Sequence, residues 1–185
     1  RFDEVPAART AGVVVRRITG GGAIHHAGEL TFSIAADASH PLYQGPIADS
    51  YVRVHEAIAV ALAQFGAEAA PRGGARLESD RARTGMCFHQ STELDLAWNG
   101  AKGVGSAQRR RGGRVLHHGS IKLSASPLEP GVAVLSGARR VAPEELAPVL
   151  RAVFEIHFGA RFEAGVPDAE GRELARELGE KAAAP

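Results

Sequence analysis

Residues 16–26 read RRITGGGAIHH, with two arginines, three consecutive glycines and two histidines in eleven positions. The apolar residues before them, Gly12 to Val15, have the composition of a buried strand, and the pattern predicts a strand over residues 12–17. Glycine accepts positive φ and lets backbone N–H groups approach a ligand closely. A row of such groups beside arginine is suited to an anion, and a plain tight turn is the alternative.

Length and composition indicate one globular domain. The chain has 185 residues, 44% hydrophobic and 23% charged, with a net charge of +1. A nucleic-acid partner is not favoured, because the charge is near zero and no aromatic residues interleave with the arginines. No apolar run is long enough to predict a membrane span. The single cysteine, Cys87, excludes an intrachain disulfide and is typical of a reducing cytoplasm.

Apolar periodicity predicts the elements of the first half. Residues 29–35 alternate as a half-buried strand, and residues 36–48 form a loop. Residues 49–65 form an amphipathic helix, with Asp49 or Ser50 as its cap and Gly66 at its end. Residues 66–86 form a strand fragment and a loop.

The second half contains a hairpin and two helices. A strand over residues 93–98 turns at Asn99-Gly100, a strong hairpin signal, and returns over residues 102–108. A basic turn over 109–113 leads to a strand over 115–123. Helices are predicted over 143–158 and 168–182. The order predicts an α+β fold with a mixed or antiparallel sheet.

Two further dense stretches follow the hairpin, KGVGSAQRR at 102–110 and HGS at 118–120. Together with RRxTGGGAxxH at 16–26 and ELTFS at 29–33, they resemble the lipoate–protein ligase and octanoyltransferase family, which shares its catalytic core with biotin–protein ligases. The resemblance implies one catalytic domain of that type over residues 1–185. It also implies an N-terminally incomplete domain, because family members carry a longer segment before the two arginines.

The resemblance assigns two catalytic side chains. Lys102 matches the family's catalytic lysine, although its spacing alone fits a solvated lysine after a turn. Cys87, fifteen residues earlier, matches the acyl-carrying cysteine of octanoyltransferases that act on the glycine-cleavage H protein. A lone cysteine is otherwise more often a small buried hydrophobe.

The resemblance also implies a set of acyl- or adenylate-binding residues. These are Arg16, Arg17, Thr19, Gly20, Gly21, Gly22, Ala23, His26, Gly105, Ser106, Ala107, Gln108, His118, Gly119 and Ser120. His26 is followed by Ala27 where the family usually has aspartate. His117 and His118 face opposite sides of their strand, so either can be a core histidine. No metal site is predicted, because the paired histidines and the lone cysteine lack a ligand spacing.

The sequence leaves three functions open. The first is transfer of octanoate, or lipoate, from octanoyl-acyl carrier protein through Cys87 to a lysine of a lipoyl domain such as H protein, without a cofactor. The second is ATP- and Mg²⁺-dependent ligation of lipoate through an adenylate. The third is a non-catalytic acyl-binding or scaffold role. The arginines at 109, 110, 111 and 114 are either a solvated turn or a docking surface for an acidic partner.

Overall fold

The computed structural model describes residues 12, 14–136 and 139–183. Five strands form one antiparallel sheet in the order β1-β5-β4-β3-β2. The strands are β1 (Glu29–Asp37), β2 (Ala70–Pro71), β3 (Leu96–Trp98), β4 (Ala101–Arg111) and β5 (Arg114–Lys122). The predicted α+β fold with an antiparallel sheet is confirmed.

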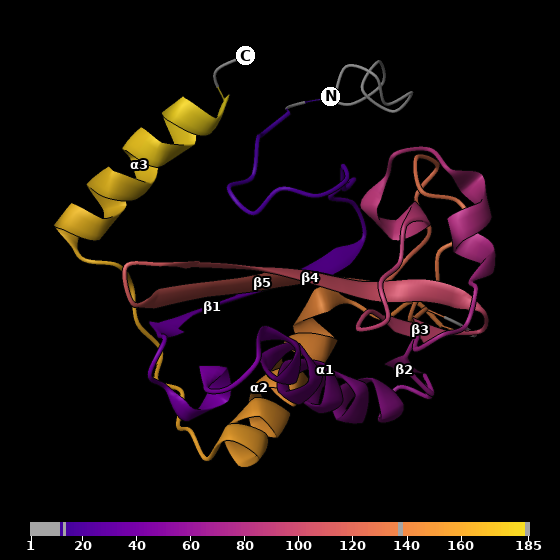
Figure 1. Cartoon of the computed structure of the whole chain (residues 1–185), viewed down its shortest axis with the longest axis horizontal. Helices are drawn as coiled ribbons and strands as arrows, with labels where there is room; N and C mark the ends of the chain where they lie inside the picture. Colours follow the sequence, from indigo (N-terminus) through magenta and orange to yellow (C-terminus); the bar gives the residue numbers. More distant parts are fainter. Residues whose placement is uncertain (1–11, 13, 137–138, 184–185) are drawn as a thin grey trace.

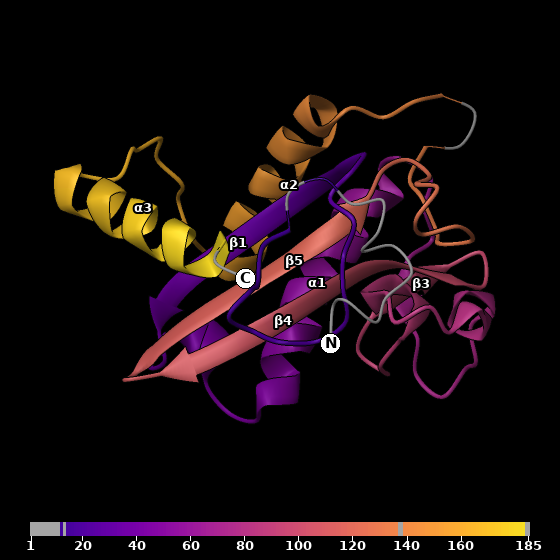
Figure 2. The same cartoon turned by 90° about the horizontal axis from the view of Figure 1, so that it is seen from above.

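Helices cover one face of the sheet, and the glycine-containing segment crosses the other (Figure 1). Helix α1 (Ile47–Ala63) and helix α2 (Pro143–Phe158) pack side by side beneath the strands. Helix α3 (Ala169–Ala183) stands apart from both layers, at the β1 side of the sheet, in the two views of Figures 1 and 2. We call the side occupied by α1 and α2 the helix face and the opposite side the loop face.

The apolar core lies between the sheet and the helices. Helix α1 buries the stripe that its spacing predicts, including Val54, Ile58 and Leu62. Alternate residues of β1, such as Phe32 and Ile34, pack against the same core. The periodicity therefore predicts both the helix and the face that it buries.

Two tight turns connect β3 to β4 and β4 to β5. Asn99 and Gly100 have φ values of 51° and 74°, and Gly112 and Gly113 have 57° and 72°. Positive φ at both central residues matches the right-handed twist of the flanking strands. The predicted Asn-Gly hairpin is confirmed, whereas the basic turn predicted over 109–113 is shorter, because Arg109 to Arg111 belong to β4.

The strand predicted over residues 12–17 is wrong. Gly12 and residues 14–17 have no strand structure, and Val13 lies outside the described residues. Val14 and Val15 are 42% and 60% exposed. A strand needs a neighbouring backbone to complete its hydrogen bonds, and this segment passes over the loop face instead of joining an edge of the sheet (Figure 1).

Several element boundaries also differ from the predictions: β1 extends to Asp37, into the predicted loop 36–48, and α1, β3 and α3 begin at other residues. Helix α1 begins at Ile47 after Pro46, so neither Asp49 nor Ser50 caps it, and Ser50 Oγ instead donates to the Ile47 carbonyl. Strand β3 begins only at Leu96, because residues before it form a turn closed by Asp95 N–H on the Thr92 carbonyl. Helix α2 spans the predicted range, and α3 begins one residue after the predicted Asp168, whose carboxylate accepts from Gly171 N–H.

Among the described residues, the structure contains no helix with both the length and the apolar character needed to cross a membrane.

Gly103 gives a test of the sheet. A Cβ at this position would overlap the ring of Trp98, which lies in the core. We expect Gly103→Ala to lower the free energy of unfolding by about 1–3 kcal/mol, as overpacking of a filled core does. Gly74→Ala is the control, because nothing lies within 4 Å of a Cβ there and its φ is not positive. Urea denaturation measures both, and equal effects of the two substitutions would contradict this packing.

Candidate active site

The glycine segment lies directly against the turn that carries Cys87. The Ala23 carbonyl accepts from Cys87 N–H at 2.7 Å, and Ala23 N–H donates to the Gly85 carbonyl at 3.3 Å. A Cβ at Gly22 would be 2.8 Å from the Gly85 oxygen and 3.0 Å from Cys87 N. Glycine is therefore required at position 22 for this close approach. Two segments that are more than sixty residues apart in the sequence meet here.

Lys102 brings the second predicted catalytic group to the same place. Its Nζ lies 3.8 Å from Cys87 Sγ, 3.1 Å from the Cys87 carbonyl and 3.1 Å from the Gln90 carbonyl. It forms an ion pair at 2.9 Å with Asp95 Oδ2. The Lys102 side chain is only 3% exposed, so it is not the solvated lysine that its spacing alone allowed. Cys87 is partly exposed in the 3-10 turn Cys87–His89.

A β-bulge turns Lys102 toward Cys87. Leu96 pairs with Val104 and Ala97 with Lys102, so Gly103 is an extra residue on β4. In a regular strand Lys102 and Val104 would share one face, yet Val104 lies in the helix-face core. A Cβ at Gly105 would be 2.7 Å from Lys102 Cε, which places the lysine on the side of Gly105. The bulge re-aims the side chain, as bulges near functional sites do.

Several predicted binding residues meet on the loop face. Thr19 Oγ1 and His118 Nε2 are 2.8 Å apart, and Arg17 donates to the Gly22 carbonyl at 2.6 Å. Gly105 and Ala107 are paired with Ser120 and His118 in neighbouring strands, so these four share the loop face. Burial lowers the pKa of His118, and the nearby charges of Arg17 and His26 lower it further. Gly20 and Gly21 have positive φ, and Arg16, Gly20, Gly21 and His26 are exposed.

A second buried cluster fixes the histidines after the glycines. Lys122 Nζ is 2.7 Å from Glu29 Oε2 and 2.8 Å from the His25 carbonyl. It also pairs with Glu129 Oε2 at 2.6 Å, in a geometry not aligned for a hydrogen bond. Glu29 in turn holds His26 Nδ1 at 2.5 Å. Glu29 thus supplies the carboxylate beside His26 where Ala27 provides none, a role that the sequence patterns did not indicate.

Phe88 connects the two buried lysines. Its ring centroid lies 5.3 Å from Lys102 Nζ and 4.7 Å from Lys122 Nζ, and the residue is fully buried. Both distances are within the range of cation–π attraction. The residue next to Cys87 is therefore held between two ammonium groups.

Three of the predicted binding residues lie elsewhere. Ser106 and Gln108 point to the helix face, and a Cβ at Gly119 would meet the Phe32 ring at 2.5 Å on that same side. Ser106 Oγ is 2.7 Å from His55 Nε2 and 3.0 Å from His117 Nε2. These residues support the sheet from below, apart from the glycine segment.

The directions of this helix-face network follow from its acceptors. The Leu94 carbonyl can only accept, so His55 Nδ1 donates to it at 2.6 Å. Burial lowers the pKa of His55, and the neutral ring accepts the Ser106 hydroxyl at Nε2. Ser106 Oγ then accepts from His117 Nε2–H, and His117 Nδ1 accepts from Gln108 at 3.2 Å. Each group has one consistent role.

The predicted arginine cluster is divided by the alternation of β4. Arg109 donates to the Ile18 carbonyl at 2.6 Å on the loop face. Arg110 donates to the Tyr43 carbonyl at 3.1 Å and to Ser50 Oγ at 3.0 Å on the helix face. Arg114 pairs with Asp37 at 3.3 Å. Docking of an acidic partner at these arginines stays a prediction. Arg109 and Arg110 already donate hydrogen bonds to carbonyl groups of this chain.

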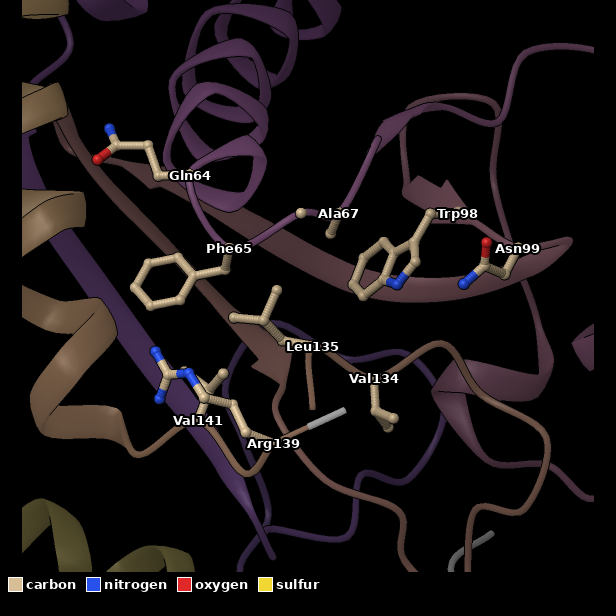
Figure 3. Close-up of a pocket in the computed structure, with 10 residues that line it drawn as sticks. Gln64, Phe65, Ala67, Trp98, Asn99, Val134, Leu135, Arg139 and Val141 are labelled. Carbon is tan, nitrogen blue, oxygen red and sulfur yellow. The ribbon is translucent and has the colours of Figure 1, made fainter. Parts of the chain in front are cut away.

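A cavity of about 480 Å³ lies away from Cys87 and Lys102. It is bounded by residues after the end of α1, by the β3–β4 turn and by residues near α2 (Figure 3). Phe65, Trp98, Leu135 and Arg139 are among its lining residues. No predicted site residue lines it, and in the described part of the chain no group of three His, Cys, Asp or Glu side chains is placed to hold a metal ion.

The fold and these motifs agree with comparisons to known proteins. The model of the lipoyl protein ligase A/B catalytic domain matches residues 4–156. Octanoyltransferase LipM of Kyrpidia tusciae is 31% identical over 190 residues, covering 89% of this chain and 69% of that protein. The chain therefore belongs to the lipoyl protein ligase A/B catalytic domain family.

Other relatives match over shorter segments. Octanoyltransferase LipM of Moorella thermoacetica is 41% identical over 111 residues, which is 60% of this chain and 41% of that protein. The match to LipM of Carboxydothermus hydrogenoformans spans 39% of that protein. The chain thus spans less than half of the length of these two relatives.

Solved structures support the same fold. A candidate lipoate protein ligase from Thermoplasma acidophilum with bound lipoic acid superposes with a TM-score of 0.77 at 23% identity, covering 97% of this chain and 73% of that chain. A lipoate-protein ligase A bound with ATP superposes with a TM-score of 0.72 at 22% identity, covering 95% of this chain and 70% of that chain.

The buried His117 predicts a pH dependence of stability. Burial, with smaller contributions from His55, His118 and Arg110, lowers its pKa to about 3. The pKa of a histidine in the unfolded chain is about 6.5. Between pH 6.5 and pH 3 the unfolded chain binds a proton that folded His117 does not. The free energy of unfolding is therefore highest above pH 6.5 and decreases as the pH falls toward 3. The free energy of unfolding of the wild type should therefore decrease between pH 7.5 and pH 5.5. We expect this decrease to be smaller in His117→Gln by about 1 kcal/mol.

Urea titrations at the two pH values measure this difference. The exposed His157→Gln is the control and should retain the wild-type dependence. Parallel pH dependences for His117→Gln and wild type would show that His117 is not held neutral.

Proposed function

We propose that the chain transfers an octanoyl group to a lysine of a lipoyl domain, through a thioester on Cys87. The observation that carries the proposal is the 3.8 Å distance between Lys102 Nζ and Cys87 Sγ beneath the glycine segment. The 31% identity with an octanoyltransferase over 89% of the chain supports the same reaction.

The first step forms the acyl-enzyme. The Cys87 thiolate attacks the carbonyl carbon of a carrier thioester, a C–Sγ bond forms, and the carrier sulfur leaves and takes a proton. The Lys102 ammonium stabilises the negative charge on the attacking sulfur. It also lies close enough to stabilise the oxyanion that develops on the carbonyl. Exchange between two thiols needs neither ATP nor Mg²⁺.

The second step releases the acyl group to the acceptor. The neutral amine of the acceptor lysine attacks the Cys87 thioester, a C–N bond forms, and Sγ leaves as the thiolate beside Lys102. The amine loses a proton as the amide forms. The covalent intermediate thus divides one transfer between two partners that bind in turn.

The loop face is the proposed acyl site. Gly105, Ala107 and Ser120 are small residues on this face of β4 and β5, and among the described residues the buried Ser120 Oγ has no hydrogen-bond partner. Arg17, Thr19 and the glycines 20–22 close the same side. Ala23 fixes the Cys87 turn, while Ser106, Gln108 and Gly119 support these strands from the helix face. Arg16, His26 and His118 are proposed to face the polar end of the donor.

The proposed partners are an octanoyl-acyl carrier protein as donor and a lipoyl-domain protein such as H protein as acceptor. ATP-dependent ligation of lipoate is the alternative, in which Cys87 would only pack near the site. A structurally similar protein is a ligase bound with ATP. The cysteine beside the catalytic lysine favours the transferase, since adenylate chemistry needs no thiol.

Cys87 separates these functions. We expect octanoyl-carrier protein alone to add one octanoyl group to Cys87, seen by intact mass and removed by hydroxylamine. Cys87→Ser should lose both this adduct and transfer to H protein. ATP-dependent lipoylation that persists in Cys87→Ala would contradict the transferase. A lack of mass gain on every component, with or without ATP and lipoate, would support the non-catalytic scaffold.

Lys102 gives a second test of the mechanism. We expect Lys102→Ala to slow octanoyl transfer about 10²–10³-fold, the usual effect of removing an oxyanion donor. Lys102→Arg should also fail, because a planar fork cannot reproduce the contacts of a compact ammonium. Lys102→Ala leaves Asp95 buried and unpaired, so it should also be less stable. Rates are therefore compared at a temperature where circular dichroism shows the variant folded, and more than about a tenth of the wild-type rate would exclude the role.

A further inference from the structure

We propose that Asp95 is a positioning residue that keeps Lys102 charged and aimed at Cys87, an inference that rests on the proposed function. Asp95 Oδ2 lies 2.9 Å from Lys102 Nζ, and the two side chains are 6% and 3% exposed. The family resemblance did not assign a role to Asp95. Its contacts, its anchoring and its charge each support the role.

Lys102 is held by three hydrogen bonds and one ion pair. Its ammonium has three donors, and Nζ donates to the Cys87 carbonyl at 3.1 Å, to the Gln90 carbonyl at 3.1 Å and to Cys87 Sγ at 3.8 Å. Asp95 Oδ2 lies 2.9 Å from Nζ as the partner in an ion pair. The two carbonyls and the carboxylate thus hold the ammonium where it reaches the sulfur.

Asp95 supplies the charge that this buried ammonium needs. The Cys87 and Gln90 carbonyls are neutral, whereas Asp95 carries the negative charge in direct contact with Nζ. Burial disfavours an ammonium that lacks a counter-ion, and such a group tends to lose its proton. A neutral lysine would give no electrostatic support to a thiolate. The carboxylate thus preserves the charge on which the first step depends.

The carboxylate is itself anchored. Thr92 donates to Asp95 Oδ2 twice, from its backbone N–H at 2.7 Å and from its hydroxyl at 3.1 Å. Arg72 N–H donates to the Asp95 carbonyl at 2.8 Å, and His55 of α1 holds the preceding Leu94 carbonyl. Gly105 leaves room for the pair, because a Cβ there would be 2.7 Å from Lys102 Cε and 3.0 Å from Lys102 Nζ. The ion pair is therefore built into the fold.

The test is the pH profile of Cys87 alkylation by iodoacetamide, followed by intact mass from pH 6 to pH 9. In Asp95→Asn the buried Lys102 side chain has no carboxylate beside it. We expect the alkylation rate, relative to wild type, to fall by about tenfold or more between pH 6 and pH 8, the effect of about one unit in a proton equilibrium. Asp95→Glu, which retains the charge, should recover part of the rate.

Two comparisons separate positioning from general damage. Asp80→Asn is the control: Asp80 accepts from Ser91 in the same region and has no contact with Lys102 among the described interactions. It should follow the wild-type profile. Thr92→Val keeps the charge of Asp95 and removes one of its hydrogen bonds, so kcat should fall while KM changes little. This variant tests the positioning role even where Asp95→Asn does not fold. A wild-type profile for folded Asp95→Asn, or an unchanged kcat for Thr92→Val, would overturn the proposal.

Alkylation needs no octanoyl donor. If wild-type protein transfers no octanoyl group, the proposed function fails, yet the Asp95→Asn profile still shows whether Asp95 maintains the charge of Lys102. If transfer occurs and the profiles are identical, the inference about Asp95 fails alone.

Discussion

The contact between a buried ammonium and a partly exposed thiol connects the two halves of the chain. Lys102 is on the central strand β4, and Cys87 is on a turn that the glycine segment holds by backbone hydrogen bonds. Burying the lysine is unfavourable without partners, so the carboxylate of Asp95 and two carbonyls must be in place. Gly22 and Gly105 allow these approaches, since a Cβ at Gly22 would meet the backbone of Gly85 and Cys87, and one at Gly105 would meet the Lys102 side chain.

The sheet separates the supporting hydrogen-bond network from the proposed site. On the helix face, His55, Ser106 and His117 form a closed hydrogen-bonded network that fixes β4 and β5 on α1. On the loop face, the same strands present small residues and a buried hydroxyl beside Lys102. Because Gly103 is the extra residue of the bulge, Lys102 lies on the loop face although Val104, two residues later, lies on the helix face.

Local patterns predicted most elements because their causes are local. The stripe of α1, the Asn99-Gly100 turn and the Pro143 start of α2 each follow from neighbouring residues. The strand at 12–17 failed because pairing depends on a distant neighbour. The candidate site rests on ordered motifs and stays a prediction, whereas the burial of Lys102 and the contacts of Lys122 and Glu29 depend on the tertiary fold. The sequence did contain a signal for Asp95. The Asn99-Gly100 hairpin pairs Ala97 with Lys102. Asp95, two residues before Ala97, is therefore on the same face and diagonal to Lys102.

The central claim is that Cys87 carries the acyl group while Lys102 stabilises its charge. A rapid-quench single turnover with octanoyl-carrier protein and a lipoyl-domain acceptor tests this most directly. The account predicts that octanoyl-Cys87 appears before the product and decays at the rate at which octanoyl-lysine forms. Product that forms without this intermediate, or faster than the intermediate decays, would contradict it.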